Sequence, residues 1–293
     1  MDRTQIQRVR RFNRLVTQRV GALQDGYLSR GRPLGEARLI FEIGADGADA
    51  SSLRGRLGLD SGYLSRLLRS LDAQGLVTVE KKAGDARRRS LALTRKGREE
   101  LSSYEKLSDE LAASILEPLD TARRDRLMLA MGEVERLLRA ASVEIVAVAA
   151  GDAQARWCLD EYFRELTSRF EEGFDPSRDK AGEMNEMTPP AGVFMLARLE
   201  GDPVGCGGLK RIDETMGEIK RVWTAPSARG LGVARRIVRR LEAAARDMGL
   251  KGVRLDTNRA LTEAQALYRT EGYREVARFG DNPYAHHWFA KEL

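Results

Sequence analysis

Two short segments of the chain combine residue types and spacing that suit the binding of an anion. The first is RGLGVA at 229–234, which runs into RRIVRRLEAAARDMG with the apolar period of a helix. Glycines at a helix start let backbone N–H groups approach a ligand, and the positive end of the helix dipole favours phosphate. The second is DARRRSLALT at 85–94, where three arginines stand at the tip of an expected hairpin. The surroundings of each segment indicate which phosphate it would bind.

Length and composition favour a cytoplasmic protein with two globular domains. The chain has 293 residues, of which 42% are hydrophobic and 32% are charged, and this is enough material for more than one core. We expect no membrane partner, because no apolar run reaches the ~18 residues of a membrane helix and the N-terminus lacks a signal-peptide core. The two cysteines and two histidines form no metal-binding motif, so we predict no metal site.

The positive net charge lies in the first half of the chain. Residues 1–142 contain 27 basic and 20 acidic side chains, whereas residues 143–293 contain 23 and 24, which accounts for the net charge of +6. A basic domain suits a polyanion, because neutralised phosphates release their counterions. The same surplus would also keep the domain soluble, so charge alone leaves both interpretations open.

The N-terminal half is expected to form a helix-rich domain with one β-hairpin. The helix over 61–75 follows a turn at Gly58 and places four leucines on one face. Two helices joined by a short turn and followed by a hairpin are typical of a winged helix-turn-helix fold. The full expectation is helices over 4–29, 36–43, 51–57, 61–75, 95–117 and 121–141, with strands at 77–79 and 91–93.

The face of the helix over 61–75 that points away from the leucines is predicted to enter the major groove of double-stranded DNA. Arg87, with Arg88 and Arg89, would stand at the hairpin tip, where arginine suits a narrow minor groove, and Asp85 can brace Arg87 by an ion pair. An ordinary amphipathic helix followed by a solvated turn is the alternative. The residues expected to bind DNA are Ser61, Tyr63, Ser65, Arg66, Arg69 and Arg87.

The N-terminal half resembles the MarR family of transcriptional regulators. The pattern DxRxxxLxLT followed by RKG resembles the wing of that family, and GYLSRLLRSLDAQGLV resembles its recognition helix. The resemblance extends over about residues 1–142. It implies binding to double-stranded DNA and a homodimer formed by the outer helices.

Residues 143–293 are expected to form a second domain with a mixed α/β (α+β) fold. Strand-like alternation begins directly after the helix ending near residue 141, so we place the boundary between domains 1–142 and 143–293 and expect direct packing. The expected elements are strands at 143–149, 193–199, 203–211, 217–224 and 252–257, helices at 153–171, 231–248 and 262–271, and a final β pair.

This second half resembles the GNAT N-acetyltransferases. The resemblance rests on EIKRVWTAPSARGLGVARRIVRRLEAAARDMG and on VRLDTNRALTEAQALYRTEGYREV, and it extends over about 150 residues. Neither the P-loop nor the dinucleotide-binding pattern fits the glycine segment. The resemblance implies acetyl-CoA as the co-substrate. Its pyrophosphate would then lie on Arg229, Gly230, Leu231, Gly232, Val233 and Ala234.

Further roles follow from the same resemblance. The strand residues Val222, Trp223 and Thr224 would lend backbone groups to the pantetheine arm, and one of their amides would polarise the thioester carbonyl. Tyr268 would act as general acid toward the sulfur, the alternative being a tyrosine that only packs. Asn258 would contact the cofactor or the backbone, the alternative being a capping role.

The base and the acceptor are less well defined by the sequence. Glu218 is the candidate base, and the alternative is a surface carboxylate paired with Lys220 or Arg221. His286 and His287 are adjacent in a strand and therefore point to opposite faces. Arg178, Lys180 and Arg198 favour an amino-acid-like small amine, to be bound in part by segment 171–192.

Three functions remain open at this point. The chain is a DNA-binding regulator fused to an active small-molecule N-acetyltransferase, or a regulator whose GNAT half only senses acetyl-CoA or an amine, or an enzyme that uses the winged helix only to dimerise. Acetylation of a protein lysine is a further alternative for the acceptor. Intact Arg229, Gly232 and Tyr268 favour an active enzyme, and the basic residues Arg66, Arg69 and Arg87 favour DNA binding.

Overall fold

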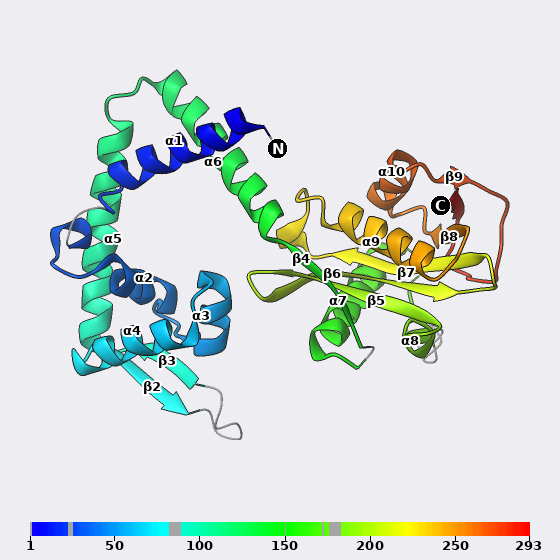
Figure 1. The fold of residues 1–293 in the computed structure, drawn as a ribbon, viewed down its shortest axis with the longest axis horizontal. Coiled ribbons are helices and arrows are strands. Elements are labelled where there is room, and N and C mark those ends of the chain that lie inside the picture. The colour runs from blue at the N-terminus through cyan, green and yellow to red at the C-terminus, as the bar shows by residue number, and fades with distance from the viewer. Residues whose placement is uncertain (1, 23–25, 82–88, 150, 172, 176–182) are drawn as a thin grey trace. The chain divides into compact units, whose positions relative to one another are not determined.

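Helix α6 (Thr121–Ser142) contains the point at which the chain divides into two units, Met1–Met131 and Gly132–Leu293 (Figure 1). The structure is a computed structural model that describes residues 2–22, 26–81, 89–149, 151–171, 173–175 and 183–293. The division precedes the boundary at 142/143 expected from the sequence.

Hydrogen bonds explain why the end of α6 belongs to the second unit. The Arg136 guanidinium donates to the carbonyl of Gly230 at 2.9 Å. The Arg236 guanidinium donates to the carbonyls of Ala140 and Val143 at 2.8 and 2.6 Å. The last turns of α6 are thus tied to the segment that begins the later helix α9.

The first unit packs helices against a small antiparallel sheet in the strand order β1-β3-β2. The four leucines of α4 are buried against α2, as their spacing predicted. The order of helix, turn, helix and hairpin agrees with the expected fold. The elements are α1 (Arg3–Arg19), the 3-10 turn η1 (Tyr27–Ser29), α2 (Leu34–Ile43), β1 (Ala48–Asp49), α3 (Ala50–Leu57), α4 (Ser61–Ala73), β2 (Val77–Lys81), β3 (Arg89–Leu93), α5 (Arg95–Leu116) and the start of α6.

Two elements of the first unit differ from the expectation. The helix expected over 4–29 ends at Arg19, because Gly21 takes a left-handed φ of 67° and Tyr27 turns instead toward the core of this unit. Strand β1 was not expected; its two residues pair with Leu91 and Ser90 of β3, and Asp49 also caps α3. Both differences depend on tertiary contacts that helical periodicity does not contain.

The second unit is built on a seven-stranded mixed sheet in the order β4-β5-β6-β7-β8-β10-β9. Only the pair β7–β8 is parallel among the described strands. A short helix, α8, which was not among the expected elements, lies within the segment 171–192. The elements are β4 (Glu144–Val148), α7 (Ala153–Arg169), α8 (Glu183–Glu186), β5 (Gly192–Leu199), β6 (Asp202–Arg211), β7 (Met216–Thr224), the 3-10 turn η3 (Pro226–Ala228), α9 (Val233–Asp247), β8 (Gly252–Thr257), α10 (Thr262–Thr270), β9 (Arg274–Glu275) and β10 (His287–Glu292).

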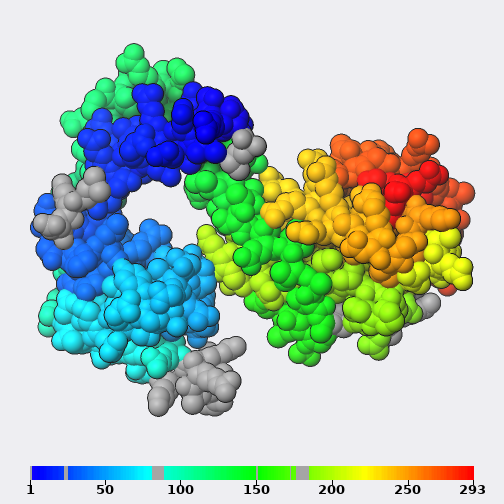
Figure 2. All heavy atoms as spheres, in the orientation of Figure 1, coloured from blue at the N-terminus to red at the C-terminus, as the bar shows by residue number. Residues whose placement is uncertain are grey.

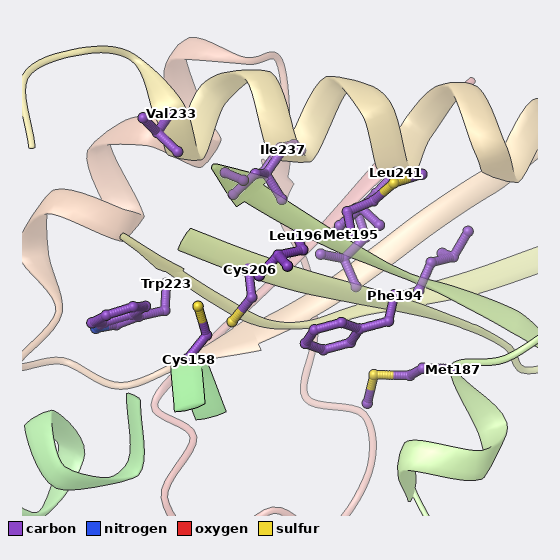
Figure 3. Close-up of a cluster of buried hydrophobic side chains, with 14 of the residues drawn as sticks. Cys158, Met187, Phe194, Met195, Leu196, Cys206, Trp223, Val233, Ile237 and Leu241 are labelled. Atoms are coloured by element: carbon purple, nitrogen blue, oxygen red, sulfur yellow. The ribbon is translucent and has the colours of Figure 1, made fainter. Parts of the chain in front are cut away.

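Helices cover both faces of this sheet, with α9 on one side and α7 on the other (Figure 1). Figure 3 shows Ile237 and Leu241 of α9 above the strands, and Met187 and Cys158 below them. These side chains are completely buried. The core therefore runs through the sheet and fixes the positions of α7 and α9 relative to the strands between them.

Strands β7 and β8 pair only at their beginnings. Met216, Gly217 and Glu218 face Gly252, Val253 and Arg254, whereas β7 continues to Thr224 and β8 continues to Thr257. The carboxyl ends of two neighbouring parallel strands thus separate. Ligands bind at such openings in α/β sheets. Within the described residues, no helix is both long and apolar enough to span a bilayer.

Candidate functional site

A cavity of about 500 Å³ lies in the second unit, beside the end of β7. Its walls come from α7, β7, the segment 228–235 and α10. Most of the residues expected to bind acetyl-CoA line it, although they come from separate elements. The lining includes Val222, Trp223, Thr224, Arg229, Gly230, Gly232, Val233, Ala234 and Tyr268.

The N-terminus of α9 supplies uncapped backbone donors to this cavity. Gly232 is the N-cap residue with a left-handed φ of 74°, and no side chain caps the helix. The first hydrogen bond that closes a helical turn runs from the Arg236 N–H to the Gly232 carbonyl at 3.1 Å. The preceding N–H groups therefore have no partner inside the helix, which suits an anion. Leu231 is the one residue of the motif at 229–234 that does not line the cavity, because its side chain is buried in the core.

The strand β7 offers further polar groups at the cavity. The pairing of β7 with β6 shifts register near its end, so that Val222 has no paired residue on β6. The preceding residue, Arg221, has a left-handed φ of 59°. The Thr224 hydroxyl is buried and has no hydrogen-bond partner within the described residues. A buried polar group without a partner is costly and indicates a missing ligand or water. These groups fit an amide-containing arm such as pantetheine.

Tyr268 on α10 lines the same cavity and is only 6% exposed. Its ring packs on Tyr273 and Phe289, with centroid distances of 5.7 and 5.9 Å. Burial, with a smaller contribution from the Asp256 carboxylate, raises the pKa of this phenol well above its usual range. Tyr268 therefore keeps its proton at neutral pH, as a proton donor must.

Glu165 on α7 is a cavity residue that the sequence did not indicate. Its carboxylate accepts hydrogen bonds from the Trp223 indole N–H at 2.8 Å, from the Arg229 guanidinium at 2.6 and 2.7 Å, and from Arg169 at 3.2 Å. Arg169 also donates to Glu263 of α10 at 2.9 Å. In the sequence, the only signal was the four-residue spacing of Glu165 and Arg169, and such pairs are common on the solvated faces of helices.

Glu218 lies outside the lining of the cavity. Its carboxylate is nearly buried and pairs with Lys220 at 3.0 Å and with Arg254 at 3.1 Å. The pairing with Lys220 is the alternative that the sequence left open. The structure thus places the candidate base in a network of charges rather than beside Tyr268.

Asn258 makes backbone contacts at the edge of a second cavity of about 230 Å³. Its amide donates to the Tyr284 carbonyl at 2.7 Å and accepts from the Ala260 N–H at 2.8 Å. Of the two histidines, His286 lines this second cavity, whereas His287 contacts Glu275 at 2.7 Å. The structure therefore separates Asn258 from the lining of the larger cavity.

Of the segment 171–192 expected to bind the acceptor, Glu171 and Gly173 line the second cavity. Arg198 donates to the Gln154 side chain at 2.6 Å and lines neither cavity. Arg178 and Lys180 lie outside the described residues. Cys206 is buried in β6, where burial raises the pKa of its thiol, and Figure 3 shows its sulfur pointing toward Cys158. No cluster of three metal-ligating side chains occurs in the described part of the chain.

The candidate nucleic-acid interface lies on α4 of the first unit. Ser61, Tyr63, Arg66 and Arg69 are exposed, and Ser65 is half-buried. The Arg66 guanidinium lies 5.6 Å from the centroid of the Tyr63 ring, and Arg69 donates to the Ser65 carbonyl at 3.2 Å. Among the described residues neither arginine forms a salt bridge, so both charges are available to a phosphate. Arg87, together with Asp85 and Arg88, lies outside the described residues.

Comparison with known proteins gives the same two parts. A model of the "Acetyltransferase (GNAT) family" matches residues 159–273, and a model of a "Winged helix DNA-binding domain" matches residues 39–111. An IAA acetyltransferase from Azospirillum brasilense is 36% identical over 99 residues, which are 33% of this chain and 65% of that protein. The chain thus spans just under two thirds of the length of that relative.

Two further proteins are similar to the second unit. The uncharacterized N-acetyltransferase YsnE from Bacillus subtilis is 33% identical, over 33% of this chain and 76% of that protein. The crystal structure of an acyl-CoA N-acyltransferase from Klebsiella pneumoniae is 25% identical and covers 52% of this chain and 99% of that one, with a TM-score of 0.44. The chain belongs to the GNAT acetyltransferase family, whose acyl donor is acetyl-CoA, and it carries a winged helix DNA-binding domain before its acetyltransferase domain.

Proposed function

We propose that this protein is an acetyl-CoA-dependent N-acetyltransferase for a small amine, joined to a DNA-binding transcriptional regulator of the MarR type. The observation that carries the enzymatic half is the single cavity in which the uncapped start of α9 and the protonated Tyr268 come together. The first feature suits the diphosphate of the donor and the second suits its sulfur.

The chain's residues account for the main steps of acetyl transfer. Val222 lies outside the β6 ladder, which supports the proposal that one of its backbone groups polarises the thioester carbonyl. The amine nitrogen forms a bond to the carbonyl carbon while the carbon–sulfur bond breaks, and Tyr268 gives its proton to the departing sulfur. A direct transfer of this kind needs no acyl-enzyme, which agrees with the buried position of Cys206.

Glu218 stays the proposed base for the proton that the amine loses. Its ion pairs set a condition on this role, because the incoming ammonium group must replace Lys220 or Arg254 at the carboxylate. The variant Glu218→Gln would then lower turnover while the Kd of coenzyme A stays the same. Turnover equal to that of the wild type would restrict Glu218 to a structural role.

The experiment that tests the enzymatic proposal measures thiol release from acetyl-CoA with a panel of amines and amino acids. One strong acceptor, with activity lost in Tyr268→Phe, would establish the enzyme and name its substrate class. Binding of acetyl-CoA without turnover on any small amine would instead support a sensor or a protein-directed acetyltransferase.

The proposal of a homodimer rests on the apolar side of α1. This helix is closed at its start by a capping box from Asp2 and Gln5, yet it buries none of its side chains, and Figure 2 shows it at the surface. Val9, Phe12 and Leu15 are 58%, 45% and 55% exposed. Contiguous exposed apolar side chains mark interaction surfaces. Light scattering should give a dimer mass for the wild type and a monomer mass for Phe12→Glu.

DNA binding of the winged helix unit is proposed to use the exposed face of α4. Selection from a random-sequence duplex library, followed by fluorescence anisotropy, tests this interface because the selection itself identifies the duplex that the protein prefers. A sequence-specific duplex that loses affinity in Arg66→Ala would support the assignment. Specific binding that is unchanged in that variant would contradict it.

A further inference from the structure

Glu165 joins three walls of the larger cavity through one carboxylate. It lies on α7, it binds the indole of Trp223 on β7, and it binds Arg229 in the loop before α9. Its side chain is 20% exposed, and both carboxylate oxygens are used. Glu165 belongs to neither of the two sequence motifs that form the rest of the cavity.

The contacts of Arg229 show what this carboxylate controls. The Arg229 Nη2 donates to both oxygens of Glu165, at 2.7 and 2.6 Å, and its Nε donates to the Thr224 carbonyl at 3.3 Å. Within the described residues, Nη1 has no hydrogen-bond partner. Because a guanidinium is planar and its donors have fixed directions, holding two of its nitrogens sets the direction of the third.

We propose that Glu165 is a positioning residue for the acyl donor: it holds Arg229 so that Nη1 is ready to donate to the diphosphate of coenzyme A. The inference rests on the proposed use of acetyl-CoA. The Arg229 side chain is 49% exposed, so without this partner it would sample several rotamers and lose conformational entropy when the diphosphate binds. Because Glu165 orders the Arg229 side chain before the diphosphate binds, much of this entropic cost is removed.

The negative charge of Glu165 has an opposite effect, because it repels a diphosphate. The guanidinium groups of Arg229 and Arg169 both contact this carboxylate, and Arg169 also pairs with Glu263, so the two basic and two acidic side chains balance in charge. Hydrogen bonds between charged groups are also stronger than neutral ones, and the indole N–H adds a third donor. The affinity gained because Glu165 positions Arg229 is therefore expected to exceed the affinity lost because its carboxylate repels the diphosphate.

Two ligands separate a positioning effect from a change in cavity shape. Coenzyme A contains the diphosphate, whereas pantetheine lacks it but occupies the same arm of the cavity. Calorimetric titration of the full chain should show that Glu165→Ala raises the Kd of coenzyme A about 10-fold, the loss of one charged hydrogen bond. Glu165→Gln should raise it only about threefold, because the amide oxygen still accepts from the indole and the guanidinium. The Kd of pantetheine, measured by competition, should not change.

Two further variants complete the test. Glu161→Gln is the matched control, because Glu161 lies one turn earlier on α7 and pairs with Arg164. It should leave both Kd values unchanged. In an Arg229→Gln background, Glu165→Ala should cause no additional loss, since the residue through which it acts is absent.

Specific outcomes would overturn the inference. Tighter binding of coenzyme A in both Glu165 variants would show that the carboxylate competes with the diphosphate. An equal loss for pantetheine would show that Glu165 maintains the shape of the cavity and acts independently of Arg229. A wild-type chain that does not bind coenzyme A would refute the proposed function and this inference together, whereas unchanged binding in Glu165→Ala refutes the inference alone.

Discussion

The two units present different chemical groups to a phosphate. In the second unit the proposed donors are backbone N–H groups at the start of α9, together with the Arg229 guanidinium, inside a cavity of about 500 Å³. In the first unit they are the exposed side chains of Arg66 and Arg69 on α4. Backbone donors are fixed by the fold and recognise a ligand by shape, whereas exposed arginines adapt to a long polyanion and compete with salt.

The comparison is tested most strongly at Tyr268, the proposed general acid of the cavity. Tyr268→Phe removes the phenolic proton but keeps the ring that packs on Tyr273 and Phe289. A general acid contributes 10²–10⁴-fold to a rate, so turnover should fall by about 100-fold or more. The affinity for coenzyme A should stay the same, because the hydroxyl acts only on the departing sulfur. Steady-state kinetics and calorimetry on one preparation measure both quantities, and equal turnover would remove the acid role.

The second test concerns the arginines of α4. The double variant Arg66→Ala, Arg69→Ala should weaken binding of specific DNA by about 10- to 100-fold and lower the slope of log K against log salt by about 2. Acetyl-CoA turnover in the same protein serves as the control for folding. A salt slope equal to that of the wild type would mean that these side chains do not contact phosphate.

A smaller effect is expected from the backbone of the cavity. Gly232→Ala forces a side chain into a left-handed conformation at φ 74°, which costs roughly 1 kcal/mol, so affinity for coenzyme A should fall about fivefold. Gly132→Ala is the matched control, because Gly132 lies inside α6 with no atom within 4 Å of an added Cβ. That change should stabilise the protein by about 0.5–1 kcal/mol in thermal unfolding. A loss of coenzyme A affinity in Gly132→Ala as large as in Gly232→Ala would contradict the assignment of the Gly232 backbone to coenzyme A binding.

The smallest expected effect is the absence of an alkaline limb in the pH profile. An ordinary phenol loses its proton near pH 10, whereas burial raises the pKa of Tyr268 well above that value. The proton is therefore present at every pH below the raised pKa, and acid catalysis should not decline between pH 8 and about 10. Single-turnover rates across this range test the statement. A decline near pH 9 that disappears in Tyr268→Phe would show that the site is more hydrated than its packing indicates.

Some elements were predictable because the responsible interactions are local. The leucine stripe of α4 and the glycine start of α9 each depend on residues that are only a few positions apart. Helix periodicity and capping act over this range. The expected fold class followed from these elements, and both domain families agree with it.

Other features depended on contacts between distant parts of the chain. Helix α1 ends ten residues before its expected end at position 29, because Tyr27 packs on Tyr104 of α5. The last turns of α6 are held by Arg236, which lies 96 residues beyond the carbonyl of Ala140. Neither periodicity nor composition contains these partners.

By itself, the sequence determined most of the helices and strands and where backbone donors for a phosphate occur, because these depend on neighbouring residues. Only the tertiary structure decided which charges meet. It placed Glu165 on Arg229, 64 residues away, and Glu218 on Arg254, 36 residues away. Ionic and hydrogen-bonded partners are chosen by where the packed helices and strands bring side chains together, and spacing along the chain does not encode that choice.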